Sequence, residues 1–171
     1  LWNRIKEASS RINKRHQEHF EGLKDEQKRN LELKTELCVK AEELSGEILT
    51  TRKDWNKASD QLIEIQKVWK TIGFAPQKDN ARIYERFRAA CDRFFELKRG
   101  FYDQLKAEMD HNLQLKTEIC VAAETLKDSE QWKKTTDELI ALQKRWKEIG
   151  PVSRRHSDAI WKRFRTACDY F

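Results

Sequence analysis

The densest group of residues able to do chemistry is a set of eight basic side chains between positions 144 and 165. Only Glu148 and Asp158 oppose them, so the segment has a surplus of six positive charges (8 − 2 = 6), equal to the chain's net charge of +6. Clustered bases attract phosphate backbones with little sequence preference, because binding releases condensed counterions. The candidate nucleic-acid-binding residues are Lys144, Arg145, Lys147, Arg154, Arg155, Lys162, Arg163 and Arg165.

Two alternatives stay open for this basic group. It can be a solvated face whose bases pair with acids on other helices, which is the ordinary role of such residues in a chain with 37% charged residues, or it can bind an acidic protein. Aromatic residues alternate with the bases, as in sites that stack nucleobases. However, Trp161, Phe164, Cys168 and Phe171 have helical spacing, so we expect them to pack in a core.

Residue types that support catalysis or metal binding occur without the spacing that such sites need. His16 and His19 lie three residues apart, but no third ligand stands at conventional zinc spacing. His156 has no neighbouring cysteine to activate. The five glycines are scattered, so no loop is built to hold phosphate. We therefore predict that the protein is not an enzyme and that it uses neither a cofactor nor a metal.

Packing explains the cysteines and a recurring Lys-Thr-Glu segment better than chemistry does. Thr117 and Glu118 belong to that segment, and recurrence in each repeat is typical of a packing motif. The cysteines form no Cys-x-x-Cys pair, and each falls among apolar residues at helical spacing, where a free cysteine acts as a small buried hydrophobe. The four residues are Cys38, Cys91, Cys120 and Cys168.

An internal repeat determines which elements hold these residues. The segment NLELKTELCVKAEEL at residues 30–44 recurs as NLQLKTEICVAAETL at residues 112–126. Further along, WNKASDQLIEIQKVWKTIG at residues 55–73 recurs as WKKTTDELIALQKRWKEIG at residues 132–150. Ordered matches of this length indicate tandem structural repeats.

The third match identifies a long helix. IYERFRAACDRFF at residues 83–95 recurs as IWKRFRTACDYF at residues 160–171 and, more loosely, as LWNRIKEASSRI at residues 1–12. Residues 1–44 align with residues 83–126 without a gap, and neither stretch contains proline. Each is therefore predicted to be one helix of roughly 42 residues, or about 60 Å at 1.5 Å per residue.

The two Trp-containing segments are predicted to be shorter helices with one apolar face, because their apolar residues follow steps of three and four. The first copy has Trp55, Ala58, Leu62, Ile65, Trp69 and Ile72. The second copy has Trp132, Thr135, Leu139, Leu142, Trp146 and Ile149. The next segment repeats the pattern with Tyr84, Phe87, Cys91 and Phe94 in the first copy.

Glycine and proline mark the ends of these shorter helices. Gly73 and Gly150 follow the last apolar residue, so we expect them to adopt the left-handed conformation that ends many helices. Pro76 and Pro151 come shortly afterwards. Asn80 and Ser157 are then expected to be the N-caps of the following helices.

The apolar pattern weakens in the middle of each long helix, which predicts that the helix is shared between units. We expect an all-α fold of tandem three-helix bundles that share long continuous helices and form an elongated, spectrin-like rod. Residues 1–29 are assigned to the C-terminal helix of a preceding repeat and residues 30–99 to the first three-helix repeat. Residues 100–111 are a helical strut, and residues 112–171 are the second repeat.

These motifs resemble a known family. The Trp helix ending in W-K-x-I-G and the W-x-R-F-R-x-A-C-D-x-F succession of residues 161–171 are similar to the bacterial helical repeat family called domain of unknown function 349. The likeness covers two near-complete copies and part of a third, in which Ile5 replaces the Phe and Ser9 the Cys. The resemblance implies a bacterial cytoplasmic protein and supplies no activity.

The function expected from these observations is binding without catalysis. The leading hypothesis is a helical module that docks on RNA, DNA or the ribosome through basic inter-helix loops. The alternative is a scaffold that binds a protein, or itself, through an apolar stripe that runs into the strut. Those residues are Leu97, Phe101, Leu105 and Met109. No stretch approaches the roughly 18 apolar residues of a membrane span, so no membrane contact is expected.

Overall fold

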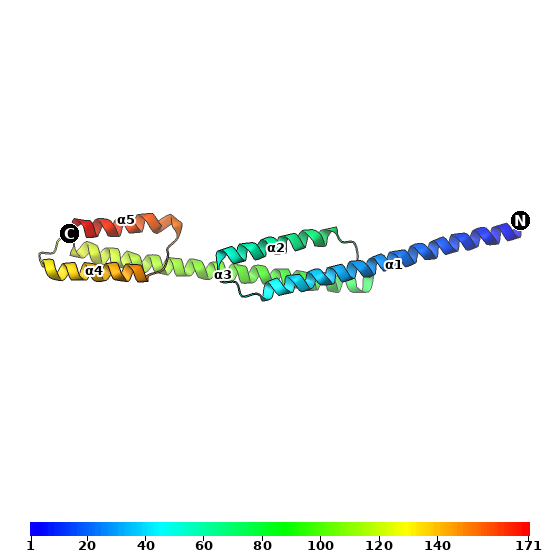
Figure 1. Ribbon diagram of the computed structural model, residues 1–171, viewed down its shortest axis with the longest axis horizontal. Coiled ribbons are helices and arrows are strands. Elements are labelled where there is room, and N and C mark those ends of the chain that lie inside the picture. The colour runs from blue at the N-terminus through cyan, green and yellow to red at the C-terminus, as the bar shows by residue number, and fades with distance from the viewer. The chain divides into compact units, whose positions relative to one another are not determined.

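The protein is all-α, as predicted, in a computed structural model that describes residues 1–171. It contains no strand. The chain is rich in Lys and Glu and has only five glycines and two prolines, and such a composition favours long helices. The five helices are α1 (Trp2–Gly46), α2 (Arg52–Thr71), α3 (Gln77–Leu126), α4 (Trp132–Glu148) and α5 (Arg154–Tyr170) (Figure 1). No helix combines enough length and apolar character to cross a lipid bilayer.

The chain forms two compact units, which we call unit 1 (residues 1–98) and unit 2 (residues 99–171). Helix α3 is unbroken and belongs to both: its first part packs with α1 and α2, and its last part packs with α4 and α5. The predicted sharing of one continuous helix by two three-helix units is therefore confirmed.

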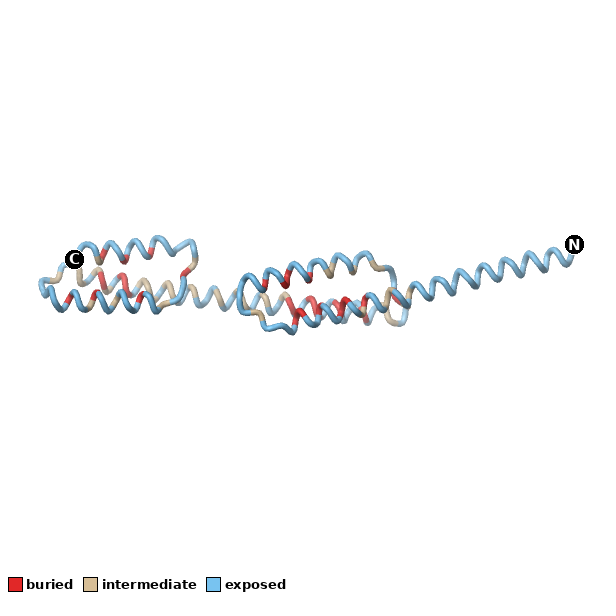
Figure 2. The backbone as a smooth tube through the Cα atoms, viewed as in Figure 1, coloured by how far each residue is buried: buried red, intermediate tan, exposed pale blue.

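Each unit has a small core in which the three helices contribute equivalent residues (Figure 2). In unit 1 the stacked pair is Trp69 on Phe87, with ring centroids 4.1 Å apart. In unit 2 it is Trp146 on Phe164, at 4.6 Å. The core of unit 2 is completed mainly by Ile119, Cys120, Ala123, Leu139, Val152, Ile160 and Ala167.

Three aromatic residues that the spacing placed in the core are exposed instead. Tyr84, Trp132 and Trp161 are 52%, 68% and 49% exposed. The inward positions of α3 and α5 are taken by Ile83 and Ile160, one residue earlier. Since successive residues of a helix point about 100° apart, the aromatic side chains fall on the flank of the core.

The two glycines after the Trp helices are not left-handed, because no glycine in the chain has a positive φ. The helices end where Ile72 and Ile149 become extended. The glycines instead allow a close approach. A Cβ on Gly150 would lie 2.9 Å from Asn112 Nδ2, and one on Gly73 would lie 3.0 Å from the equivalent amide nitrogen. The prediction of a left-handed conformation was therefore wrong. Glycine is needed at these positions because a larger side chain would collide with the asparagine amide.

The close approach at Gly150 predicts that substitutions of Gly150 and Gly100 have opposite effects on stability. Asn112 Nδ2 donates to Pro151 O at 2.9 Å. Gly150→Ala pushes this amide away from that carbonyl oxygen, so we expect a loss of about 1 kcal/mol or more in the free energy of unfolding. Gly100 lies inside α3, and a Cβ added there would meet nothing within 4 Å. Gly100→Ala is expected to raise stability by about 0.5–1 kcal/mol. Urea unfolding of both variants measures the two changes in the free energy of unfolding. Changes of the same sign and size would contradict the prediction.

The predicted N-caps are also displaced, since both helices begin earlier than expected. Helix α5 starts at Arg154 with Ser153 as its N-cap, so Ser157 lies in the first turn and its backbone N–H donates to Ser153 O at 3.0 Å. In α3 the N–H of Asn80 donates to Pro76 O, also at 3.0 Å. The Asn80 side chain reaches back and accepts from Ala75 N at 3.3 Å. Pro76 stands immediately before α3, where its lack of a backbone N–H removes no helical hydrogen bond.

Candidate nucleic-acid interface

Four residues of α3 at intervals of four contact the rest of unit 2, and we call this row the ladder: Asn112, Lys116, Cys120 and Glu124. Asn112 Nδ2 donates to Pro151 O at 2.9 Å, and Lys116 Nζ lies 5.0 Å from the Trp146 ring centroid. Cys120 Sγ donates to the carbonyl oxygen of Ile160 at 3.6 Å. These contacts tie α3 to the loop, to α4 and to α5 respectively, so they fix the positions of the basic side chains on α4 and α5.

The ladder ends in a bidentate ion pair. Arg163 Nε donates to Glu124 Oε1 at 2.7 Å and Arg163 Nη2 donates to Oε2 at 3.0 Å. The hydrogen bond from the guanidinium lowers the pKa of the Glu124 carboxyl. Bidentate geometry favours this pairing over others. Arg163, a predicted nucleic-acid-binding residue, therefore already has a carboxylate partner.

Unit 1 repeats the same ladder, which shows that it belongs to the repeat. Its members lie on α1 at Asn30, Lys34, Cys38 and Glu42. Asn30 Nδ2 donates to Phe74 O at 3.0 Å, and Arg86 Nε donates to Glu42 Oε1 at 2.7 Å. Sequence reasoning missed these pairings, although Asn, Lys, Cys and Glu recur at intervals of four in both copies. That interval places four side chains on one helix face.

The predicted burial of the cysteines is confirmed for three of them, whereas Cys168 is half-buried. Burial raises the pKa of the Cys38 and Cys120 thiols from 9.0 to about 11. A folded-state pKa above the unfolded value means that these thiols favour folding at neutral pH. That contribution is lost as the pH rises from about 9 to about 11.

We therefore expect stability to fall steeply in that pH window. Between about pH 8 and about pH 10.5 the free energy of unfolding should drop by about 2 kcal/mol for each of the two thiols. Urea titrations at both pH values measure the drop. The variant Cys38→Ala/Cys120→Ala should lose most of this drop. An identical drop in that variant would show that the thiols do not cause it.

All eight predicted basic residues are exposed, and the five that line a groove lie on three sides of unit 2. Lys147 and Arg165 line a groove between α4 and α5. Lys162 and Arg163 line a larger groove between α3 and α5, and Arg145 lines a third between α3 and α4. The structure thus separates a group that is contiguous in the sequence.

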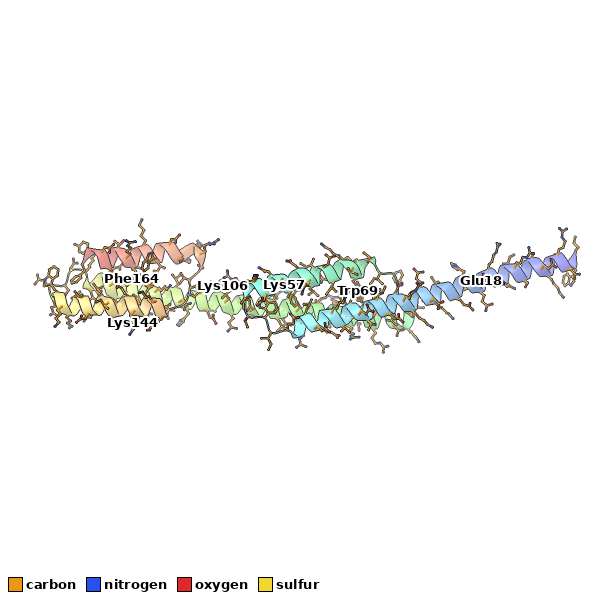
Figure 3. All side chains as sticks on the ribbon, viewed as in Figure 1. Glu18, Lys57, Trp69, Lys106, Lys144 and Phe164 are labelled. Carbon is orange, nitrogen blue, oxygen red and sulfur yellow. The ribbon has the colours of Figure 1, made fainter.

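The α4–α5 groove combines cations with exposed aromatic surface. It has a volume of about 350 Å³, and its aromatic lining consists of Trp146, Trp161 and Phe164. Trp161 lies with its ring centroid 5.7 Å from that of Trp146 and keeps 49% of its surface exposed. We name this surface, with Lys147 and Arg165, the basic–aromatic groove. Figure 3 shows Phe164 and Lys144 on the two helices that form it.

Two more predicted residues lie beside the basic–aromatic groove. Arg154 stands seven residues before Trp161 on α5, which is two helical turns, so it projects from the same side. Lys144 stands one turn before Lys147 on α4. Lys144, Lys147 and Arg154 form no ion pair, whereas Arg165 has an exposed one with Asp169 at 3.6 Å. An exposed pair of this kind stabilises little and opens readily.

The larger α3–α5 groove, of about 650 Å³, is a weaker candidate for binding an anion. Its wall contains the Glu124–Arg163 pair, which neutralises one of its cations. Apart from Tyr170 at one end, its lining has no aromatic ring. The basic–aromatic groove is smaller and contains an ion pair of its own, Arg165–Asp169, but Lys147 in its lining forms no ion pair and three aromatic residues line it.

Unit 1 has an equivalent groove with the same number of lining cations but one base fewer beside it. It is lined by Trp69, Lys70, Tyr84 and Arg88, and its volume is also about 350 Å³. Gln77 stands where unit 2 has Arg154. The exposed aromatic residue with a base four positions later also occurs near the start of α1, where Lys6 Nζ lies 5.9 Å from the Trp2 ring centroid. The aromatic–base pair is thus a feature of the repeat.

The other candidate residues show no site. His16 and His19 lie on an exposed part of α1, and the His16 ring contacts Phe20 at 4.6 Å between centroids. No group of three or more His, Cys, Asp or Glu side chains is placed to hold a metal ion. Thr117 Oγ1 donates to Leu113 O at 2.7 Å within α3.

Comparison with known proteins identifies the family. No curated protein and no solved structure matches the chain. A family model matches it twice, over residues 1–78 and residues 82–155. The two matches follow the internal repeat, since each begins with a long helix that carries the ladder and continues through the Trp helix. The chain therefore belongs to the family described as Domain of Unknown Function (DUF349).

Proposed function

We propose that the protein binds single-stranded nucleic acid, either free RNA or DNA or an exposed strand of a nucleoprotein assembly such as the ribosome. The basic–aromatic groove of unit 2 is the proposed binding surface. The observation that carries the proposal is the half-exposed Trp161 between Lys147 and Arg165. Base stacking on such a ring stabilises binding by about 1–3 kcal/mol per base, while neighbouring cations bind the phosphates.

Several features support a single strand over a duplex. Trp161 is 49% exposed at the flank of the core, and an unpaired base can stack on an exposed ring, whereas the bases of a duplex are already stacked on one another. The aromatic–base pair also recurs in three segments of the sequence, so each copy of the repeat offers a ring beside a cation. On the family resemblance, we propose that this binding takes place in the bacterial cytoplasm.

A salt titration tests the proposal directly. A fluorescent oligonucleotide of mixed sequence, single-stranded RNA in one series and DNA in another, is titrated with the chain at several salt concentrations. Binding should weaken linearly on a logarithmic plot, with a slope of about −0.7 for each phosphate neutralised. A duplex of the same sequence should bind more weakly. Absence of binding at about 50 mM salt, or binding indifferent to salt, would refute the proposal.

The alternative function, scaffolding through the strut, has less support. Leu97 is 45% exposed, but Phe101, Leu105 and Met109 are half-buried. The apolar surface available for a partner on α3 is therefore smaller than the sequence suggests. Sedimentation of the chain over a range of concentrations tests self-association. A concentration-dependent mass that is lost in Phe101→Ser/Leu105→Ser would favour this alternative.

A further inference from the structure

The first part of α1, which we call the arm (residues 1–26), exposes an apolar face. Every arm residue is exposed, and the arm extends beyond the packed helices of unit 1 (Figure 2). The apolar side chains follow helical spacing, so they form one face. They include Trp2, Ile5, Ile12, Phe20 and Leu23, which are 68%, 52%, 65%, 49% and 42% exposed.

The internal repeat shows how the same face packs elsewhere in the chain. Residues 1–44 align with residues 83–126 without a gap, so each arm position has an equivalent in α3. The arm residues Leu1, Ile5, Ala8 and Ile12 correspond to Ile83, Phe87, Ala90 and Phe94. These four α3 residues are 7%, 6%, 5% and 0% exposed.

The contacts of α3 in unit 1 define what covers this face. Ile83 O accepts from Cys38 Sγ at 3.7 Å, Phe87 stacks on Trp69, and the Phe94 ring lies 5.5 Å from that of Trp55. One covering helix thus supplies a cysteine, and the other supplies two tryptophans. Helix α5 has the same two kinds of neighbour in unit 2.

The arm also carries the charged residue that belongs to this face. Arg4 occupies the position of Arg86 and Arg163, each of which binds a glutamate in a bidentate ion pair. That glutamate always stands four residues after the ladder cysteine. Arg4 itself is exposed and forms no ion pair. The arm is therefore a third helix of the repeat in both its apolar and its charged residues.

We propose that the arm binds an antiparallel pair of helices of the same repeat type. One helix of the pair carries a cysteine followed four residues later by a glutamate, and the other carries tryptophan. The glutamate binds Arg4, the cysteine donates to Leu1 O, and a tryptophan packs on Ile5. Both such pairs within residues 1–171 are already covered, α1–α2 by α3 and α3–α4 by α5, so the partner is a further pair. For the same reason a second copy offers no uncovered pair.

A labelled fragment of residues 112–153 is the probe, because it contains the α3–α4 pair and lacks α5. Titrated with the full chain, it should show saturable binding by fluorescence anisotropy. Ile5→Asp/Ile12→Asp should weaken binding at least about tenfold, since both charges enter the buried face. Asn3→Asp/Ser10→Asp adds the same charge on the opposite face of the arm and should leave the affinity within about twofold.

A charge swap distinguishes this interface from general apolar adhesion. Arg4→Glu should weaken binding of the probe by roughly tenfold, because it opposes the probe's Glu124. Glu124→Arg in the probe should restore most of the affinity for the Arg4→Glu chain while weakening binding to the unchanged chain. Failure of the swap to restore binding, with the single changes both harmful, would overturn the assigned register.

A second experiment covers the case in which the free fragment folds poorly, by joining the helix pair covalently to the arm. Residues 112–159 are joined directly before Leu1, which reproduces the repeat because Leu1 is equivalent to Ile160. Tethering raises the effective concentration of the pair into the millimolar range. Amides of residues 2–12 should then gain at least about tenfold protection from hydrogen exchange, and Ile5→Asp/Ile12→Asp should remove it. No gain in protection would overturn the proposal. So would dimerisation of the untethered chain through the same residues without competition from the probe.

Discussion

Phe164→Ala is expected to unfold most of unit 2 while leaving unit 1 folded. The Phe164 ring is 2% exposed and stacks on Trp146 with an interplanar angle of 5°. Removing a buried aromatic ring costs about 3–5 kcal/mol, which includes the cavity left behind. A unit of this size has a total stability near the lower end of about 5–15 kcal/mol, so the loss is a large part of the whole.

Hydrogen exchange with mass analysis of peptides measures this effect for each unit separately. In Phe164→Ala, amides of α4 and α5 should lose most of their protection, and amides of α2 should keep theirs. Phe87→Ala is the matched variant, because Phe87 stacks on Trp69 in the same way, and it should reverse the pattern. Trp161→Ala removes a larger but half-exposed ring and should cost only about 1 kcal/mol. Equal losses in Phe164→Ala and Trp161→Ala would contradict the assignment of the core.

The helices and their sharing between units could be predicted from the sequence because they depend on local features. Residues 83–126 contain no proline and only one glycine, and they match residues 1–44 without a gap. Nothing in such a stretch favours a break, and α3 is continuous through all of it. Repetition strengthens this inference, since a loop would tolerate differences in length between the two copies.

The exposure of Trp161 could not be predicted in the same way. Periodicity defines an apolar face only to within about one residue, because neighbouring residues are about 100° apart on a helix. Ile160 and Trp161 are both apolar, so the choice of inward residue depends on the two helices that pack against α5. The same limit explains why adjacent bases in the sequence lie on three sides of unit 2.

The glycine positions illustrate a different limit. Gly73 and Gly150 have the sequence context of a left-handed helix end, and the structure shows no positive φ at either. Their requirement comes from Asn30 and Asn112, which stand 43 and 38 residues earlier (73 − 30 and 150 − 112). In the sequence, a tertiary contact of this kind is visible only as an asparagine and a glycine that recur together in both copies.

Reversing the charge around the basic–aromatic groove is expected to abolish most binding to single-stranded nucleic acid. Lys144, Lys147 and Arg154 are exposed and form no ion pair, so their substitution by glutamate breaks no internal contact. Losing three phosphate contacts should lower the magnitude of the salt slope by about 2 and the affinity at low salt by roughly 100-fold. Oligonucleotide titrations at several salt concentrations measure both quantities.

A matched variant distinguishes the effect of charge at the groove from the effect of the net charge of the chain. Lys14→Glu/Arg15→Glu/Lys24→Glu on the arm lowers the net charge by the same six units, from +6 to 0, and should retain most of the affinity. Trp161→Ala should weaken single-strand binding by about 1–3 kcal/mol while leaving the salt slope unchanged, because stacking releases no counterions. If both triple variants lose affinity equally, binding depends on overall charge, and the groove is not the site. If only the groove variants lose affinity, the basic–aromatic groove is the binding site.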